Sequence, residues 1–389
     1  MSAATDNDFR RLAELSVPAK RAAYSDRMAW TMALLASIAY EPFDEESDDI
    51  LMAMAKDLAQ LAAGEKVDAA EIKKRLQDLA VTLAGVGRRT GKTDNEVLKA
   101  ALAVGGFTLA GDTPVHIPET DTQAFVVVRK ATDTEQSFAV LCFRGTKQVR
   151  DWLTNIEVEP TPIANPRTGV DPIGNMHKGF HDAFKSAEGE IRRRLEHDEV
   201  RNLPLYVTGH SLGGALAVVA TWYLSSTTLA ACYTFGAPRV GDAGLLGWFK
   251  TPIYRIVNAA DPVPFVPPSG AFLNGMKHLF RFLAAFLPWG GILDRVVAFF
   301  VRQQDFRHYG DMKYLPFADA VDGQYPETFR IQPGISSTGR LYRYLRMFFV
   351  KPVNETDGAS NMKPDRIDRY HGMDRYRAKL RAVAINRNA

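Results

Sequence analysis

One short stretch of the sequence combines residue types that carry out acyl transfer. Residues 204–217 read PLYVTGHSLGGALA, which places Ser211 between Gly209 and Gly213, after an apolar run and before an alanine-rich one. A Gly-x-Ser-x-Gly turn between a strand and a helix is typical of a nucleophile elbow, whose strained backbone exposes the serine hydroxyl. The alternative interpretation is a polar residue in an ordinary strand-to-helix loop. The elbow interpretation predicts that Ser211 attacks a carbonyl carbon.

A serine nucleophile needs a base and a carboxylate that orients the base, and downstream of an elbow these follow in the order acid, then histidine. Asp261, in NAADPVPFVPP, comes at the end of an apolar run and is the candidate acid; the alternative is a turn-forming aspartate before proline. Three histidines follow it, His278, His308 and His371. His278 lies in an apolar stretch and is interpreted as structural, whereas chain order leaves His308 and His371 equally eligible.

The elements around these residues predict an α/β fold, with a mostly parallel central sheet covered by helices on both faces. From about residue 113, apolar strand-like runs alternate with helical ones. The strand-like runs are QAFVVVRK, SFAVLCFRG, PLYVT, LAACYTFGAP and PIYRIVN, and the helical ones include HKGFHDAFKSAEGEIRRRLEH and GGALAVVATWYLSS. Asp261 ends the last of these strands, at the edge where active sites of open α/β sheets assemble.

The chain divides into two predicted parts. Residues 1–112 contain apolar residues at helical spacing in runs 27–40 and 68–89, and are predicted to form a helical region packed on the core. Residues 113–389 are predicted to form the catalytic domain, with an apolar helical cap inserted at about 269–304. This insertion is interpreted either as a buried helical hairpin or as a cap that lines an acyl pocket and opens onto lipid.

Composition narrows the functional class. The 389 residues are 46% hydrophobic and 24% charged with a formal net charge of +3, which is ordinary for a globular protein and disfavours a dedicated nucleic-acid binder.

Cys142 and Cys232 lie in apolar runs and are predicted to be buried free thiols. No cluster has metal-ligand spacing, so neither a metal nor an organic cofactor is expected. Neither a signal peptide nor a transmembrane stretch is recognised, which predicts a soluble protein, cytoplasmic or exported without a cleaved signal.

Five motifs together resemble one known family. In chain order they are CFRGTKQVRDWLTN, MHKGFHDAF, GHSLGGALA, YTFGAPRVGD and NAADPVPFVPP. They are similar to the signatures of the class 3 lipases, the fungal-type triacylglycerol lipase family of the α/β-hydrolases. The resemblance covers roughly residues 115–385. It implies the α/β-hydrolase fold and ester hydrolysis through an acyl-enzyme.

The resemblance also implies roles for particular residues. The family's catalytic histidine corresponds to His371, which would serve Ser211 together with Asp261, whereas His308 matches a histidine before a late strand. The oxyanion hole would be formed by the backbone N–H groups of Thr146 and Leu212. The alternative is that FRGT merely closes a strand with a turn.

The resemblance further implies a lid at residues 147–156, which carry Trp152; an ordinary surface helix is the alternative. The predicted function is therefore hydrolysis of carboxylic esters of lipids, as in triacylglycerol lipases, with a lipid ester as substrate and contact with a lipid or membrane surface. The alternatives are a phospholipase A1, a short- or medium-chain carboxylesterase, and a non-enzymatic membrane-binding protein that retains the fold.

Overall fold

The structure is a computed structural model. It describes residues 21–40, 98–99, 102–103, 105–111, 113–131, 136–146, 159–166, 168–226, 228–267, 306–318, 320, 325–336, 339 and 370–386. The predicted cap at 269–304, the predicted lid at 147–156 and the predicted helix at 68–89 lie outside these residues.

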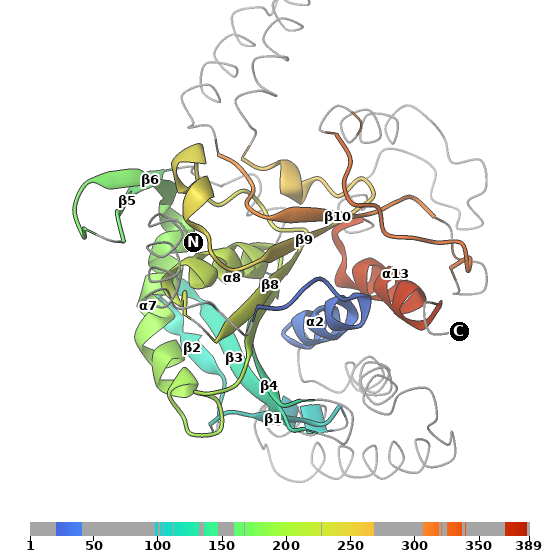
Figure 1. Cartoon of the computed structure of the whole chain (residues 1–389), viewed down its shortest axis with the longest axis horizontal. Coiled ribbons are helices and arrows are strands. Elements are labelled where there is room, and N and C mark those ends of the chain that lie inside the picture. Colours follow the sequence, from blue (N-terminus) through green and yellow to red (C-terminus); the bar gives the residue numbers. More distant parts are fainter. Residues whose placement is uncertain are drawn as a thin grey trace, which may run out of the picture.

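The centre of the described part is one eight-stranded sheet (Figure 1). Its strands are β1 (Phe107–Leu109), β2 (Val115–Ile117), β3 (Thr122–Arg129), β4 (Phe138–Phe143), β7 (Leu205–His210), β8 (Leu229–Phe235), β9 (Ile253–Asn258) and β10 (Asp311–Leu315). Their order is β1-β3-β4-β7-β8-β9-β10, with β2 also paired to β3. The strands from β4 to β10 pair in parallel, whereas β1, β2 and β4 pair antiparallel to β3. The predicted mostly parallel sheet is therefore confirmed.

Helices cover both faces of this sheet. Helices α2 (Asp26–Ile38) and α13 (Met373–Asn386) pack against each other on one face, and α7 (Lys178–Leu195) and α8 (Leu212–Tyr223) cover the other. The short 3₁₀ helices are η2 (Pro118–Thr120), η3 (Ala243–Trp248) and η4 (Val263–Phe265). A separate antiparallel hairpin pairs β5 (Pro160–Ala164) with β6 (Pro172–His177).

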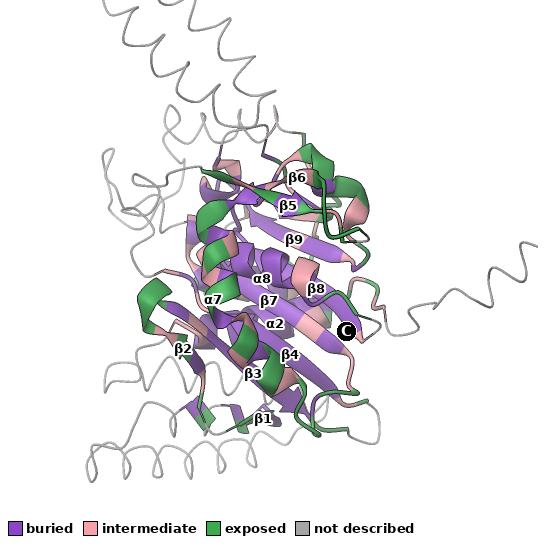
Figure 2. Cartoon of the chain, turned by 90° about the vertical axis from the view of Figure 1, so that its left-hand side faces the viewer, coloured by how far each residue is buried: buried purple, intermediate pink, exposed green. Residues whose placement is uncertain are grey.

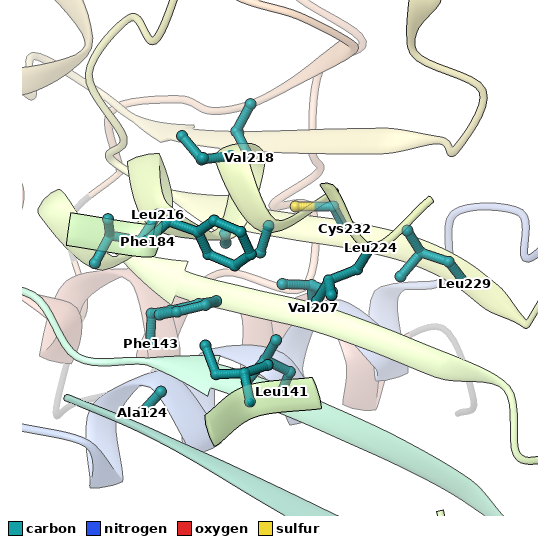
Figure 3. Close-up of a cluster of buried hydrophobic side chains, with 14 of the residues drawn as sticks. Ala124, Leu141, Phe143, Phe184, Val207, Leu216, Val218, Leu224, Leu229 and Cys232 are labelled. Atoms are coloured by element: carbon teal, nitrogen blue, oxygen red, sulfur yellow. The ribbon is translucent and has the colours of Figure 1, made fainter. Parts of the chain in front are cut away.

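Strand β4 shows why the sheet is covered on both faces. All six of its residues are buried, as Figure 2 shows for the central strands. Because side chains alternate along a strand, Val140 and Cys142 pack into the cluster with α2 and α13, while Leu141 and Phe143 face α7 and α8. Figure 3 shows the second cluster, in which Leu141 and Phe143 lie near residues of α7, β7 and α8. An unbroken apolar strand is what a two-sided core requires.

The part of the chain before residue 113 contributes more than helices. Helix α2 begins after Ser25, whose hydroxyl accepts a hydrogen bond from the Met28 N–H at 3.3 Å. Residues 107–109, predicted to lie in a helical region, instead form the edge strand β1. Strand β1 pairs with the end of β3, so tertiary pairing decides the conformation of this three-residue segment. The all-helical prediction for residues 1–112 is wrong at this strand.

His177 is a buried histidine at the start of α7. Its ring stacks on Phe180, with ring centroids 4.0 Å apart, and among the described residues neither ring nitrogen has a hydrogen-bond partner. Burial lowers the pKa of His177 to about 4, against a small opposing contribution from its own backbone. The ring is therefore neutral in the folded protein at neutral pH.

Acidification is expected to destabilise the fold through His177. Its folded pKa of about 4 lies below the ordinary value of 6.5, so the unfolded chain binds the extra proton and stability falls as the pH drops through that window. At pH 4.5 this group alone is expected to remove about 2 kcal/mol of the free energy of unfolding. His177→Phe should flatten the decline between pH 7 and 4.5 in urea titrations. The exposed His197→Gln should not, and equal slopes for all three proteins would contradict the prediction.

Candidate active site

Ser211 occupies a strained turn between β7 and α8. Its backbone dihedrals are φ 56° and ψ −126°, a conformation that non-glycine residues rarely adopt. The Ser211 N–H donates to the Phe235 carbonyl at 2.9 Å, which ties the turn to the end of β8. The Ser211 carbonyl accepts from the N–H of Gly214 at 3.0 Å. The turn therefore has the geometry of a nucleophile elbow.

Two glycines allow the chain to pass close to itself at this turn. A Cβ on Gly209 would lie 2.2 Å from the Gly213 carbonyl oxygen, and a Cβ on Gly213 would lie 2.4 Å from that of Phe143. Both distances are far shorter than a carbon–oxygen contact permits, so each position requires glycine. The start of α8 is thereby brought against the end of β4.

The two predicted oxyanion residues, Thr146 and Leu212, lie beside this contact between the end of β4 and the start of α8. Thr146 follows β4 after Arg144 and Gly145, and Leu212 is the first residue of α8, where a backbone N–H has no partner within the helix. The loop is anchored by the Arg144 N–H, which donates to the Gln123 carbonyl at 2.9 Å. A Cβ on Gly145 would lie 2.6 Å from the carbonyl oxygen of His210, the residue before Ser211. The loop carrying Thr146 therefore lies against the elbow.

Asp261 and His371 form a buried pair. His371 Nδ1 lies 3.0 Å from Oδ1 and 2.9 Å from Oδ2 of Asp261, across 110 residues of sequence. Asp261 follows β9, and its Oδ1 also accepts from the Val263 N–H at 2.9 Å. His308, the other eligible histidine, lies instead with Nε2 2.7 Å from the Pro264 carbonyl oxygen. The structure thus places His371, and not His308, against the carboxylate.

His371 lies against His210 and Gly236, two residues beside the serine turn. The rings of His371 and His210 lie 4.3 Å apart between centroids, and His210 directly precedes Ser211. A Cβ on Gly236 would lie 2.9 Å from His371 Nδ1, and Gly236 follows the residue that accepts the Ser211 N–H. Ser211 Oγ and His371 Nε2 are both buried and have no hydrogen-bond partner within the described part of the chain. Catalytic hydrogen bonds of this kind often tighten only when substrate binds.

Comparison with known proteins adds independent evidence. Residues 140–271 match the family model of lipase (class 3). This part of the chain belongs to the class 3 lipase family. We call it the class 3 lipase segment. It contains Ser211, Asp261, Thr146 and Leu212, whereas His371 lies outside it.

Individual relatives match over part of their length. Secreted mono- and diacylglycerol lipase 1 of Fusarium solani is 31% identical over 195 residues, which are 44% of this chain and 56% of that protein. The chloroplastic phospholipase A(1) DAD1 of Arabidopsis thaliana is 31% identical over 148 residues, or 33% of each chain. The solved Rhizomucor miehei triacylglyceride lipase is 21% identical with a TM-score of 0.41, over 64% of this chain and 82% of that one. The chain spans about half or less of the two curated relatives.

Residues beyond the class 3 lipase segment complete the surroundings of the Asp261–His371 pair. Tyr376, on α13, donates its hydroxyl proton to Asp261 Oδ2 at 2.5 Å and accepts from the Asn258 N–H at 3.0 Å. The Asn258 side chain donates to the carbonyl of Tyr370, the residue before His371, at 2.8 Å. The sequence motifs place Tyr376 near a catalytic histidine, but nothing in them indicates that it contacts the acid.

Gly236 is a second residue whose role sequence reasoning missed. It has φ +56°, and a Cβ there would lie 2.5 Å from Asp261 Oδ2. The available signal was its position directly after the strand in YTFGAP. At the end of β8 in the class 3 lipase segment, only glycine leaves room for the acid and the histidine ring together.

Tyr376→Phe is expected to lower both stability and any hydrolytic rate. The substitution removes the donor to Asp261 and leaves the buried Asn258 N–H without its acceptor, which costs about 1–3 kcal/mol. Since a less firmly held carboxylate orients His371 less well, we expect kcat to fall about tenfold with KM nearly unchanged. Steady-state kinetics and thermal unfolding measure the two effects. Tyr309→Phe, which loses a hydroxyl bond to the Asp242 carbonyl rather than to Asp261, is the control.

No group of three or more histidine, cysteine or acidic side chains among the described residues is arranged to hold a metal ion. Within the same residues, no helix is both long enough and apolar enough to cross a membrane.

Cys142 and Cys232 are buried and unpaired, as predicted, and burial raises the pKa of both thiols.

Proposed function

We propose that this chain is a serine hydrolase that cleaves carboxylic ester bonds of lipids, in the manner of a triacylglycerol lipase. The observation that carries the proposal is the buried contact of His371 Nδ1 with both Asp261 oxygens, beside the strained turn of Ser211. A carboxylate on Nδ1 fixes the tautomer that leaves Nε2 able to accept a proton. The relative named as a mono- and diacylglycerol lipase supports a lipid ester as the substrate.

In the proposed reaction, His371 Nε2 removes the proton from Ser211 as the serine oxygen attacks the ester carbonyl. Asp261 orients the imidazole and stabilises the imidazolium that forms, without becoming protonated itself. The alcohol leaves with the proton from His371, and Ser211 remains acylated. Water then attacks the acyl-enzyme, His371 again removes a proton, and the fatty acid departs as Ser211 recovers its hydroxyl.

The negative charge that develops on the ester oxygen needs fixed hydrogen-bond donors. We assign this role to the backbone N–H groups of Thr146 and Leu212, which follow β4 and begin α8 at the same edge of the sheet. Donors on fixed backbone need no reorganisation during the reaction, and each is worth about 3 kcal/mol to the transition state. The first turn of α8 also favours negative charge through its dipole.

A phospholipase A1 is the second candidate, because one 31%-identical relative carries that name and the proposed chemistry serves both lipid classes equally. A short- or medium-chain carboxylesterase and a non-enzymatic membrane-binding protein are weaker alternatives. As parts of the same proposal, residues 269–304 are assigned as a cap of the domain 113–389, and residues 147–156 as a lid. The cap is proposed to contact a lipid surface.

Two measurements on the wild-type protein test the function. The first is labelling with a fluorophosphonate, followed by identification of the modified peptide by mass spectrometry; we expect modification of Ser211. The second is the rate of hydrolysis over a panel of acetyl to long-chain glycerol esters and phospholipids. Preference for long-chain glycerol esters supports the lipase, and preference for phospholipids supports the second candidate. Folded protein that neither reacts with the probe nor hydrolyses any ester would refute both.

A further inference from the structure

The side chain of Tyr40 brings the N-terminal part of the chain to the proposed active site. Tyr40 follows α2, a hundred residues before the class 3 lipase segment begins. Its hydroxyl lies 3.1 Å from the carbonyl oxygen of His210 and 3.0 Å from Nδ1 of the same residue. A Cβ on Gly145 would lie only 1.7 Å from this hydroxyl oxygen, so the loop that carries Thr146 packs directly against Tyr40.

The hydrogen bonds of His210 fix where its proton lies. Nε2 of His210 is 2.7 Å from the carbonyl oxygen of His371, which only accepts, so Nε2 carries the hydrogen. Nδ1 of the neutral ring is then an acceptor, and the single hydroxyl proton of Tyr40 is shared between this nitrogen and the His210 carbonyl oxygen. The Tyr40 oxygen also lies directly against Gly145, where an added Cβ would meet it at 1.7 Å. A continuous series of contacts therefore runs from Gly145 through Tyr40 and His210 to the main chain of His371.

The charge states of both side chains agree with this direction of donation. Burial raises the pKa of the Tyr40 hydroxyl, against opposing effects of Arg144 and of the Gly145 backbone, so Tyr40 keeps its proton. Burial, together with the nearby His371, lowers the pKa of His210 well below its usual range. A neutral His210 does not oppose the positive charge that His371 acquires when it accepts the serine proton.

Helix α2 holds Tyr40 firmly in this position. The helix packs along α13, the helix that follows His371, on the same face of the sheet (Figure 1). Its N-terminal end is attached to the sheet by the Tyr254 hydroxyl, which donates to the Ala22 carbonyl at 3.0 Å, and by the Ala22 N–H, which donates to Ala230 at 3.1 Å. Tyr40 thus follows a helix that packs along α13 and is preceded by a segment attached to the sheet.

We propose that Tyr40 is a positioning residue, which aligns the oxyanion loop through Gly145 and the catalytic base through His210. The inference rests on the proposed hydrolase function and extends it to a part of the chain outside the class 3 lipase segment. Tyr40 touches neither the ester nor the reacting atoms. It acts through the main chains of the two residues that precede Thr146 and Ser211, and through His210 on that of His371.

Tyr40→Phe is the test, with Tyr254→Phe as its matched control. Each substitution removes one hydroxyl that binds a main-chain carbonyl, but only Tyr40 faces the site, while Tyr254 binds Ala22, in the segment before the same helix. We expect Tyr40→Phe to lower kcat about tenfold with KM within twofold of wild type. Tyr254→Phe should leave both within twofold. Thermal unfolding of both variants, measured in parallel, shows whether each remains folded.

A transition-state analogue separates positioning from a general loss of stability. A boronic acid that forms a tetrahedral adduct with Ser211 needs both the oxyanion donors and the base in place. We expect its affinity to fall in Tyr40→Phe by the same factor as kcat/KM, and to remain unchanged in Tyr254→Phe. His210→Gln, which keeps a donor near the Nε2 position, should retain more activity than His210→Ala, and its combination with Tyr40→Phe should cost less than the product of the two losses.

The outcomes distinguish the inference from the proposed function. Active wild type with Tyr40→Phe indistinguishable from Tyr254→Phe overturns the positioning role and leaves the hydrolase proposal intact. Wild-type protein that is folded yet inactive and unlabelled by a fluorophosphonate overturns the function on which the inference rests. Equal losses of kcat in both tyrosine variants would assign the effect to helix stability and would also reject the specific role of Tyr40.

Discussion

Ser211→Ala is expected to lower ester hydrolysis by about 10⁴-fold or more and to abolish fluorophosphonate labelling. Alanine lacks the oxygen that attacks the carbonyl, so no acyl-enzyme forms, and only binding and the oxyanion donors remain to accelerate attack by water. The substitution removes one buried hydroxyl that has no hydrogen-bond partner among the residues described, so the fold should lose little stability. Initial rates, probe labelling and thermal unfolding of the purified variant measure the three effects.

The matched control is Ser226→Ala, on the exposed turn after α8. Its hydroxyl lies 3.0 Å from that of the nearby Thr228, and its loss should leave hydrolysis and labelling at wild-type levels. If Ser211→Ala were labelled and hydrolysed esters as fast as this control, the nucleophile would be another residue. The strained turn at Ser211 would then have a structural role alone.

Local patterns predicted the architecture well, because they report the periodicity that burial imposes on each element. The apolar run SFAVLCFRG forms strand β4, which is buried on both faces of the sheet. The turn at Ser211 could be predicted from the spacing of Gly209 and Gly213, and in the structure both glycines lie close to neighbouring backbone. The three-residue strand β1 was missed, since so short a segment takes its conformation from its partner β3. The hairpin of β5 and β6, rich in proline and only partly buried, carried no alternating pattern either.

At the candidate site, contacts between residues far apart in the sequence limited what could be predicted. Order along the chain could not choose between His308 and His371, because the choice depends on which ring contacts the Asp261 carboxylate in the fold. His371 does so across 110 residues of sequence. Tyr40 lies 170 residues from His210, just after a helix whose sequence pattern indicates only packing. A hydroxyl at the end of an apolar helix has no local signature of its role, so only the fold reveals it.

His371→Ala is the second prediction with a large effect: kcat is expected to fall by about 10⁴-fold, close to the loss for Ser211→Ala, with a small change in KM. Without the imidazole nothing removes the serine proton, and a serine hydroxyl is a weak nucleophile at neutral pH. The double variant with Ser211→Ala should be no slower than either single one, because nucleophile and base act as one unit. Single-turnover acylation by a nitrophenyl ester measures the affected step directly.

His308→Ala provides the contrast that decides the base. His308 bonds the carbonyl of Pro264 rather than Asp261, so its loss should alter stability while the rate stays within a few-fold of wild type. Inactive His308→Ala beside active His371→Ala would reverse the assignment, and the Asp261–His371 contact would then be structural. The expected order of losses follows from geometry: a base must be held by its carboxylate before substrate arrives, and both Asp261 oxygens lie within 3.0 Å of His371 Nδ1.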